Sequence, residues 1–536
     1  MHRFSAFSRL KVHFYRAHMG AKGVQMGFAQ VHSCAVLGLG AAPVTVEVHL
    51  ANGLPSFTLV GLADTEVRES RERVRSAIQN AGLDFPSNKR ITVNLGPADL
   101  PKDSGRFDLP IAMGILAASG QVDPQALEQH VFAGELSLSG ELRAVRGALA
   151  MGLALSQASA NTAQASHHRW VLPPQSAEEA AWLPDAWVYR AAHLRDVAQA
   201  FALSPGEPPA GWTRLAAHTW PSNQASQGLD LQDVRGQANA KRALEIAAAG
   251  GHSLLMQGPP GSGKSMLAQR LIGLLPKLGP AQALASAAMM SLAGQFEPSR
   301  WGQAVLRQPH HSVSRAALLG GGVPPRPGEI SLAHHGVLFL DELPEFSRHA
   351  LEALREPLET GCVHLARGRH QVAFAAQFQL LAAMNPCPCG QLGANPPACR
   401  CTADQVQRYQ GRLSGPLLDR IDMQVSVPAL PAEVLLNPAS GDSTAVVQAR
   451  CQQAHDRAMA RRGVRNHALS PAQLMGLPIS PSAQQHLQEM AAARAWSARL
   501  VHRCLRLAQT IADLAQADQI DHAHVVQAVH YRSPAW

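Results

Sequence analysis

Residues 252–275 read HSLLMQGPPGSGKSMLAQRLIGLL, in which an apolar run is followed by a glycine-rich segment and an amphipathic run. Within it, 258–265 has the pattern G-x-x-x-x-G-K-S. The apolar run predicts a short buried strand and the amphipathic run predicts a helix, which is the setting that a phosphate-binding loop requires. A glycine-rich turn that binds nothing is the alternative, but it rarely has the whole pattern in this setting. The stretch therefore predicts a nucleotide-binding domain with a parallel α/β sheet.

The residue types of this loop suit the binding of phosphate groups. Glycines allow backbone N–H groups to turn inward around phosphate oxygens, and the N-terminus of the following helix adds its dipole. Lys264 is expected to reach the β and γ phosphates, and Ser265 is expected to bind Mg²⁺. The predicted cofactors are therefore ATP and Mg²⁺. The predicted nucleotide-binding residues are Gly258, Pro259, Pro260, Gly261, Ser262, Gly263, Lys264 and Ser265.

A second apolar run ends in two carboxylates. Residues 336–346 read GVLFLDELPEF, so that Asp341 and Glu342 follow a predicted strand. Ligands of parallel sheets bind at the carboxyl ends of the strands. Asp341 is expected to complete the Mg²⁺ shell, and Glu342 to orient and deprotonate the attacking water. On its own this motif is equally compatible with a surface strand, but its place downstream of the phosphate loop makes it specific.

Two further motifs complete the candidate site. QFQLLAAMNP (377–386) predicts another strand, which ends in Asn385 where the γ phosphate and its water would lie. RLSGPLLDRID (412–422) predicts a helix end that carries Arg412 and Arg420. In a ring of ATPase subunits, an arginine at this place can project into the neighbour's nucleotide and stabilise the charge of the transition state. Outside this order of motifs, LLDRID is more typical of a salt-bridged helix end.

Taken in this order, the motifs resemble those of AAA+ ATPases of the magnesium chelatase-related type, specifically of the bacterial YifB/ComM family. The resemblance covers nearly everything from Met26 to the C-terminus, including MNPCPCG and HRCLRLAQTIADL. It implies a hexameric, ATP-driven motor that acts on single-stranded or branched DNA, as a helicase or branch-migration enzyme in recombination or natural transformation. It also implies that Asn385 is the sensor-1 residue, Arg420 the arginine finger and Arg499 the sensor-2 arginine.

The predicted fold is multidomain α/β. Residues 44–62 alternate as two strands around a turn at Asn52 and Gly53, 65–83 has helical periodicity, and the Ala-rich segment 150–200 is expected to be mostly helical. The N-terminal part resembles the Lon-protease type within the ribosomal S5 domain 2-like fold. The expected divisions are a non-native or disordered extension (1–25), this α+β domain (26–203), a Pro- and Gly-rich linker (204–229), an AAA+ core of the parallel α/β/α type (230–430) and a helical lid that carries Arg499 over the nucleotide (431–536).

The N-terminal domain departs from a working Lon-type peptidase. Where those enzymes carry a nucleophilic serine, this chain reads PKDSGRFDLP, in which Ser104 is displaced from the expected position. Where they carry a general-base lysine, 134–152 reads GELSLSGELRAVRGALAMG, which contains no lysine. A serine without its base is not activated as a nucleophile. The domain is therefore expected to be a scaffold or to handle a substrate, and not to be a peptidase.

Two inserted segments are candidates for contact with nucleic acid. RGRHQ (367–371) is predicted to be the tip of a hairpin, which would carry Arg367, Arg369 and His370. Arginines that line a pore would follow a phosphate backbone and give salt-sensitive binding of any sequence. A solvated charged turn is the alternative. The segment 310–331 carries Arg315 and Arg326 as weaker candidates, and its two histidines are expected to be structural.

Four cysteines cluster between Asn385 and Arg420 in the pattern C-x-C-x₉-C-x-C. Four thiolates can close a tetrahedral zinc site, although C-x₂₋₄-C spacing is more usual. Reduced cysteines that only pack, and a disulfide or redox switch, are the alternatives. The candidate zinc ligands are Cys387, Cys389, Cys399 and Cys401.

Composition sets the remaining bounds. A chain of 536 residues is long enough for several domains, and eight cysteines in that length are not a secreted disulfide framework, so a cytoplasmic protein is expected. No apolar run is long enough to predict a membrane span. The formal net charge of +8 permits a polyanionic partner. The alternative function is that of a chelatase-like or chaperone-like ATPase, which would remodel a protein or a metal-insertion partner.

Overall fold

The computed structural model describes residues 27–61, 65–98, 100, 105–160, 169–184, 186–204, 206–218, 229–322, 325–367, 370–393, 398–436 and 441–532. The extension expected at 1–25 and the displaced Ser104 lie outside these residues. The chain forms two compact units. The first comprises the described residues of Met1–Ala35, Ala42–Val145 and Thr162–Ala217, and the second those of Val36–Ala41, Arg146–Asn161 and His218–Trp536.

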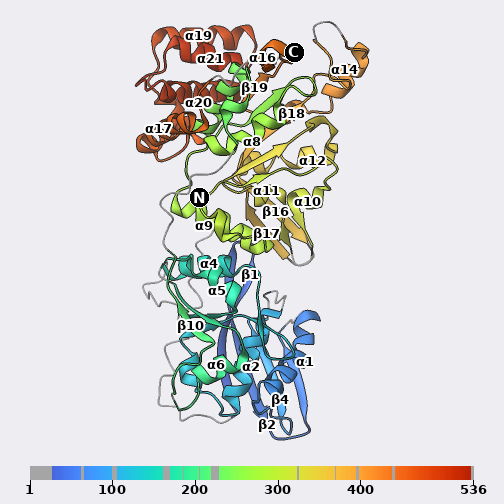
Figure 1. The fold of residues 1–536 in the computed structure, drawn as a ribbon, viewed down its shortest axis with the longest axis vertical. Coiled ribbons are helices and arrows are strands. Elements are labelled where there is room, and N and C mark those ends of the chain that lie inside the picture. The colour runs from blue at the N-terminus through green and yellow to red at the C-terminus, as the bar shows by residue number, and fades with distance from the viewer. Residues whose placement is uncertain are drawn as a thin grey trace. The chain divides into compact units, whose positions relative to one another are not determined.

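A sheet of eight strands forms the centre of the first unit, in the order β10-β9-β8-β5-β1-β2-β4-β3. Helix α2 is buried over its whole length because its sequence DLPIAMGILAA is almost entirely apolar, and it packs beside α1 (Figure 1). Apart from residues 36–41, where β1 ends and β2 begins, the elements of this unit are β1 (Phe28–Leu37), β2 (Gly40–Ala51), β3 (Ser56–Val60), α1 (Thr65–Asn80), β4 (Arg90–Gly96), α2 (Asp108–Ala118), α3 (Pro124–Leu127), β5 (His130–Phe132), β6 (Glu135–Leu136), β7 (Leu142–Arg143), β8 (Arg169–Leu172), α5 (Pro174–Ala180), β9 (Trp187–Ala191), α6 (Leu194–Ala200) and β10 (Trp212–Leu215).

Several local predictions for this part of the chain are corrected by the structure. The two strands around the turn at Asn52 and Gly53 are present, but β4 lies between them, antiparallel to β2 and parallel to β3. The segment 150–200 is mostly helical over its described residues, as expected, but it also contains the strands β8 and β9. The linker is shorter than expected, because Trp212–Leu215 pairs with β9 and the first unit continues to residue 217.

The reason for the last difference is a contact between residues far apart in the sequence. Trp212 stacks on Tyr189 with 5.0 Å between the ring centroids, and burying two aromatic rings stabilises the added strand. The Pro- and Gly-rich composition around β10 does not reveal this contact. The expected domain 26–203 also differs, because α4 (Ala148–Ala160) packs on α9 (Pro280–Ala293) within the second unit.

A largely buried ion pair joins two helices of the first unit. Arg73 Nε lies 2.7 Å from Asp108 Oδ2, and the Asp108 side chain has no exposed surface. The backbone N–H of Leu136 donates to the same oxygen at 3.2 Å. Burial raises the pKa of Asp108 to about 6, against the opposing effect of Arg73. This carboxylate therefore ties α1, α2 and β6 together.

The second unit is built on five strands in the order β12-β15-β18-β11-β19, and every neighbouring pair is parallel. Leu254 and Met256 of β11 enter one hydrophobic core, and Leu255 between them enters another, so the sheet is buried on both faces. This confirms the predicted parallel α/β domain. Its strands are β11 (Leu254–Gln257), β12 (Leu306–Arg307), β15 (Val337–Leu340), β18 (Gln379–Met384) and β19 (Met423–Ser426).

Helices and two small hairpins surround this sheet. The helices that precede β19 are α7 (Ala238–Gly250), α8 (Lys264–Leu274), α9, α10 (Arg315–Leu319), α11 (Glu329–Leu332), α12 (Arg348–Ala353), α13 (Pro357–Thr360), α14 (Ala403–Gln410) and α15 (Gly415–Leu418). The hairpins are β13 (Gly320–Gly321) with β14 (Arg326–Pro327), and β16 (Cys362–Arg367) with β17 (His370–Ala375).

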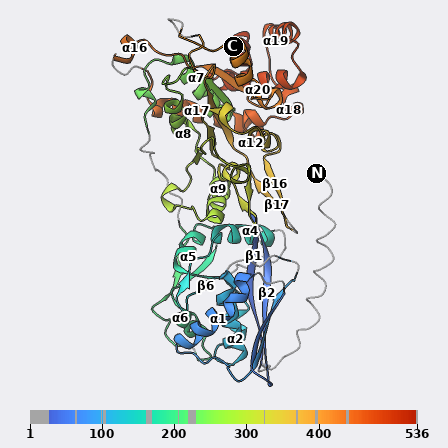
Figure 2. The same cartoon turned by 90° about the vertical axis from the view of Figure 1, so that its right-hand side faces the viewer.

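The C-terminal part of the second unit is helical, as predicted. Figures 1 and 2 both show α17, α19 and α20 grouped together, and α20 packs on α7, α17 and α21. These helices are α16 (Ala432–Leu436), α17 (Thr444–Arg462), α18 (Pro471–Met475), α19 (Pro481–Ala493), α20 (Ala498–Leu514) and α21 (His522–Arg532). Among the described parts of the chain, none of the helices combines the length and hydrophobicity that crossing a membrane would need.

Candidate functional site

The predicted phosphate loop joins the end of β11 to the start of α8. Gly261 and Gly263 have φ angles of +74° and +95°, a backbone conformation that residues with a side chain rarely adopt. A Cβ added to Gly258 would lie 2.0 Å from the carbonyl oxygen of Val427, so a side chain cannot fit there. The backbone therefore requires glycine at three positions of the loop.

Lys264 lies within hydrogen-bonding distance of both the loop and Asn385. Its Nζ donates to the carbonyl oxygens of Gly258 at 2.8 Å and Pro259 at 2.9 Å, and to Asn385 Oδ1 at 3.1 Å. Burial lowers the pKa of Lys264, and the carboxylates of Asp341 and Glu342 oppose that effect. All three hydrogen-bond partners are neutral, and a charged phosphate oxygen would be a stronger acceptor. The structure thus brings together four of the residues that the sequence predicted.

Ser265 and Asp341 offer oxygen ligands that fit Mg²⁺. Ser265 Oγ donates to Asp341 Oδ2 at 2.6 Å, which joins the start of α8 to the end of β15. Mg²⁺ prefers oxygen ligands and is usually bound through one or two protein groups together with phosphates of the substrate. A hydroxyl and a carboxylate in contact beside the phosphate loop meet that requirement.

Glu342 follows Asp341 in a strained backbone conformation. Its φ angle is +53°, in the left-handed region that is costly for a residue with a side chain. The Glu342 side chain is 54% exposed, and its Oε2 lies 3.3 Å from Nδ1 of His311. His311 also stacks on His310, with 4.0 Å between the ring centroids. Sequence reasoning treated these histidines as structural and missed the contact with Glu342, because no spacing in the chain indicates it.

Arg420 and Arg499 share one carboxylate. Both guanidinium groups form an ion pair with Glu359, and Arg420 Nη1 also donates to the carbonyl oxygen of Pro416 at 2.7 Å. The Arg420 side chain is only 10% exposed, whereas that of Arg499 is 49% exposed. The hydrogen bond from Arg420 is the main reason why the pKa of Glu359 lies below its ordinary value. The sequence predicted both arginines but not the glutamate that holds them.

These two arginines line a cavity at the N-terminal ends of the parallel strands, which we call the amino edge of the sheet. The C-terminal ends of the strands form its carboxyl edge. The cavity has a volume of about 830 Å³, and its lining includes Ser253, Gly336 and Gln379, which lie at the starts of β11, β15 and β18. The phosphate loop lies at the other edge, because it follows the carboxyl end of β11. The prediction that Arg499 closes over the phosphate loop of its own chain is therefore wrong.

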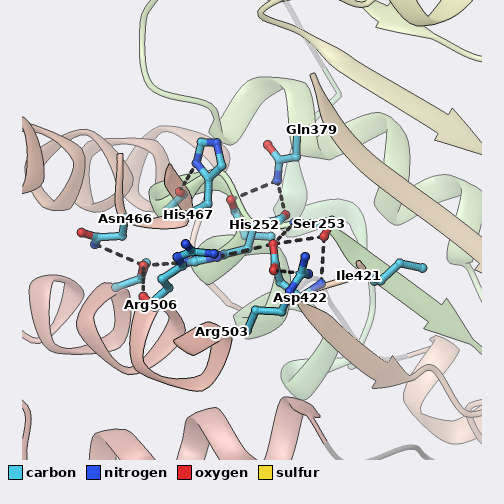
Figure 3. Close-up of polar contacts among 12 residues, drawn as sticks. His252, Ser253, Gln379, Ile421, Asp422, Asn466, His467, Arg503 and Arg506 are labelled. Atoms are coloured by element: carbon cyan, nitrogen blue, oxygen red, sulfur yellow. Dashed lines mark hydrogen bonds and ion pairs between the residues drawn. The ribbon is translucent and has the colours of Figure 1, made fainter. Parts of the chain in front are cut away.

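The physical reason for this placement is the anchoring of α20, which carries Arg499. Arg503 Nη1, one turn further along α20, donates to Asp422 Oδ1 at 2.8 Å. Asp422 Oδ2 accepts hydrogen bonds from the backbone N–H of Ser253 at 3.0 Å and from its hydroxyl at 3.1 Å (Figure 3). This network ties α20 to the start of β11 and hence to the amino edge of the sheet.

The surroundings of Asp422 favour its ionised form. Burial by itself would raise the pKa of this carboxyl, but the nearby ring of His252, the charge of Arg503 and the N–H of Ser253 hold it well below its usual range. His252 in turn pairs with the Thr510 hydroxyl of α20 at 2.7 Å. The Asp422 side chain is 15% exposed and that of Arg503 is 12% exposed, so this is a nearly buried ion pair.

The predicted nucleic-acid hairpin is present as β16 and β17. The two strands pair antiparallel, with Arg367 opposite His370 in the register. Arg369 lies outside the described residues. The other insert lies next to this hairpin, because a Cβ on Gly320 would meet Leu365 Cδ1 of β16 at 3.0 Å. Arg315 and Arg326 of that insert are exposed.

The four clustered cysteines converge in space. Their sulfur atoms all lie within 4.8 Å of one another, and all four are free thiols. Cys387 is buried, Cys389 is exposed, and Cys399 and Cys401 are partly buried. The fold therefore brings the two C-x-C segments together, so that their four sulfur atoms form one cluster.

The parallel sheet, the phosphate loop and the carboxylates beside it define a P-loop ATPase domain of the AAA+ type. Three family models match the chain: magnesium chelatase subunit ChlI at residues 230–435, subunit ChlI of Mg-chelatase at 46–168, and the C-terminal part of magnesium chelatase subunit ChlI at 441–532. The chain belongs to the YifB/ComM family of magnesium chelatase-related ATPases.

Similar proteins are found in several bacteria. The YifB protein of Salmonella typhimurium is 46% identical over 516 residues, which are 95% of this chain and 97% of that protein. The competence protein ComM of Haemophilus influenzae is 44% identical over 511 residues, which are 95% of this chain and 98% of that protein. A protein of Mycobacterium bovis, Mb2921c, is 40% identical over 520 residues.

The Asp422 network yields a prediction about stability. Asp422→Asn should leave Arg503 nearly buried without its counter-charge and lower the free energy of local unfolding of α20 by about 3 kcal/mol. Hydrogen exchange of α20 amides measures this quantity. Because the folded-state pKa of Asp422 is depressed, the wild-type advantage should be fully present above the unfolded-state pKa of about 4 and be lost as the pH falls below it.

Asp419→Asn is the matched control for this measurement, because Asp419 lies on the same loop and is exposed. It should leave the exchange of α20 unchanged. Equal exchange rates in the Asp422 variant and the wild type would show that the network does not anchor the helix.

Proposed function

We propose that the protein is an ATP-hydrolysing hexameric motor that acts on DNA, as a helicase or branch-migration enzyme. The observation that carries the ATPase part is the convergence of Lys264, Asn385, Ser265 and Asp341 on one edge of a parallel sheet. The proposed cofactors are ATP and Mg²⁺, with Zn²⁺ as a further ion at the cysteine cluster. The proposed location is the cytoplasm.

The geometry supports a definite division of roles at the nucleotide. Lys264 would exchange its carbonyl partners for oxygens of the β and γ phosphates, and the loop N–H groups would hold the phosphate chain. Ser265 and Asp341 would bind Mg²⁺, which neutralises charge on the phosphates. Glu342 would accept a proton from the attacking water. Asn385, which accepts a hydrogen bond from Lys264, would orient that water.

Two variants test this division. Lys264→Ala should abolish ATP binding, because it removes the only side-chain cation at the loop that contacts Asn385. Glu342→Gln should bind ATP normally and hydrolyse it at least roughly 100-fold more slowly, since it cannot take the proton. Equilibrium binding of a fluorescent ATP analogue and the steady-state ATPase rate separate the two effects.

Lys277→Ala is the control, because Lys277 is exposed and lies just beyond the end of α8. This variant should behave as wild type in both measurements. If Glu342→Gln hydrolysed ATP at the wild-type rate, the water would be activated by another residue.

The arginines at the amino edge support assembly into a ring. A single chain holds its phosphate loop at one edge of the sheet and Arg420 and Arg499 at the other. Arginines act in transition-state stabilisation only when they reach the phosphates. We therefore assign Arg420 as the arginine finger and Arg499 as a second arginine that acts with it. Both would release Glu359 and contact the nucleotide of a neighbouring subunit.

Mixing two inactive variants tests this assignment. Arg420→Ala should lower the ATPase rate by on the order of 10³-fold, because the neighbour's transition state loses its arginine. Mixing it with Lys264→Ala should restore part of the rate, since one variant supplies the nucleotide site and the other supplies the arginine. Steady-state ATPase assays at fixed total protein measure the gain.

Arg412→Ala is the matched control, because Arg412 lies in the same motif but pairs with Glu345 at 2.7 Å. It should retain most of the activity. Normal hydrolysis by Arg420→Ala, or a mixture no faster than the average of its parts, would contradict the ring contact.

Three observations support DNA as the substrate. The chain carries a formal net charge of +8, and its two arginine-bearing inserts lie side by side in the second unit. The Haemophilus influenzae relative is named a competence protein, and competence is the state in which bacteria take up DNA. We assign Arg367, Arg369 and His370 to contact with single-stranded or branched DNA. The first unit is proposed to be a Lon-like scaffold without peptidase activity.

DNA should stimulate the ATPase, and this effect should be sensitive to salt. We expect the stimulation by single-stranded, duplex or four-way-junction DNA to weaken steeply between about 50 and 200 mM salt, because phosphate contacts release counterions. Replacing Arg367 and Arg369 by alanine should remove the stimulation and leave the rate without DNA unchanged.

The double variant Arg300→Ala and Arg408→Ala removes two exposed arginines outside the inserts, and it should still be stimulated. A rate indifferent to every DNA would contradict the DNA motor and favour a protein partner or a metal-insertion partner, as in a chelatase-like ATPase.

A further inference from the structure

The geometry of the four clustered thiols matches a metal site. Sγ of Cys387 lies 3.4 Å from Sγ of Cys389 and 3.7 Å from Sγ of Cys399, and the Cys389 and Cys399 sulfurs are 3.6 Å apart. Zn–S bonds of about 2.3 Å in a tetrahedron place neighbouring sulfurs roughly 3.8 Å apart. A disulfide needs about 2.05 Å, so none of these three pairs of sulfurs is bonded.

We propose that Cys387, Cys389, Cys399 and Cys401 bind one structural Zn²⁺. We further propose that the segment 386–391, which carries the first two of these cysteines and is called the zinc loop, braces the phosphate loop and Asn385. The first half of this proposal stands on the four sulfurs alone. The second half rests on the proposed ATPase function and on the position of the loop beside the nucleotide site.

Backbone N–H groups around the sulfurs are arranged to stabilise thiolates. Those of Gln391 and Arg400 point at the Cys389 sulfur, that of Cys401 points at the Cys399 sulfur, and that of Cys389 points at the Cys401 sulfur. Hydrogen bonds to the sulfur atoms of metal ligands lower the charge that four thiolates place on one ion. Thiols that only fill space have no need of such donors, so this shell favours zinc over the packing alternative.

The zinc loop contacts the phosphate loop directly. Gly390 follows Cys389 and has a φ angle of +76°, and a Cβ added there would lie 2.4 Å from Cδ of Pro260. The loop therefore lies against the phosphate loop with no space for a side chain between them. Holding Cys387 and Cys389 on an ion would keep this surface in place.

The same loop also fixes Asn385, which lies two residues before Cys387. The Gln410 amide donates to the carbonyl oxygen of Pro386 at 3.1 Å, and the N–H of Asn385 points at the hydroxyl of Tyr409. Asn385 is thus held from α14 on one side and by the cysteines on the other. Since Asn385 accepts a hydrogen bond from Lys264, a loose zinc loop would disturb the lysine as well.

The experiment measures metal and nucleotide separately. The full chain, purified with a thiol reductant and without chelators, should contain about one zinc per chain by elemental analysis. Cobalt exchanged into the site should give the sulfur-to-cobalt charge-transfer absorption of a tetrahedral thiolate site. Cys389→Ser and Cys401→Ser should lose the zinc, whereas Cys362→Ser, which changes a partly buried cysteine outside the cluster, should keep it.

The zinc-free variants should bind a fluorescent ATP analogue about tenfold more weakly and lose ATPase rate by roughly tenfold or more, because displacements near 1 Å suffice for such losses. Wild-type protein stripped of zinc in excess Mg²⁺ should show the same loss and recover when Zn²⁺ is returned. This measurement on the unmodified chain separates loss of zinc from misfolding of a variant.

Protein without zinc and without the cobalt absorption would overturn the metal site. Zinc that can be removed with no change in nucleotide affinity or ATPase rate would overturn the brace. Zinc-loaded wild type that never hydrolyses ATP would contradict the proposed function instead, and the zinc content would still decide the metal site.

Discussion

The nucleotide site depends on the hydrogen bond between Lys264 and Asn385. These residues follow β11 and β18, which are neighbours in the parallel sheet, and the backbone N–H of Gly258 donates to Met384 across the same gap at 3.2 Å. The pairing of β18 with β15 then sets Asp341 beside Ser265. A buried parallel sheet keeps its register because a shift would expose apolar side chains. The positions of lysine, asparagine, hydroxyl and carboxylate are therefore consequences of strand order.

The two edges of this sheet carry opposite halves of the proposed chemistry. The phosphate loop, the carboxylates and the zinc loop lie at the carboxyl edge, and Arg420 and Arg499 lie at the amino edge. β11 has four residues, so the edges are separated by about 13 Å of strand, beyond the reach of a side chain through a packed core. One chain cannot apply both halves to one nucleotide. Two neighbouring subunits could, and this is the basis of the proposed ring.

Ion pairs at the amino edge explain why Arg499 does not lie beside the phosphate loop of its own chain. The pair of Arg503 with Asp422, supported by Ser253, draws α20 to the start of β11, and Glu359 holds the arginines nearby. A nearly buried carboxylate without these partners would lower the free energy of unfolding, so the residues of the network stabilise the fold only together. The same reasoning applies to Asp108 in the first unit, whose buried carboxylate is paired with Arg73.

The amino-acid sequence was sufficient to predict the parallel α/β domain, the phosphate loop, the cysteine cluster and the family, because each depends on residues that are adjacent in the chain or on a fixed order of motifs. Local pattern also predicted the strands β11, β15 and β18 and the helices α1 and α8. It did not predict β10, the separation of β2 and β3 by β4, or α4 packing within the second unit. Three contacts became visible in the folded chain alone: Glu359 pairs with both arginines, His311 contacts Glu342, and Arg499 lies at the edge opposite the phosphate loop. These contacts join residues that are far apart in the sequence. The packing of helices on the sheet brings those residues together, so no motif or spacing along the chain indicates the contacts.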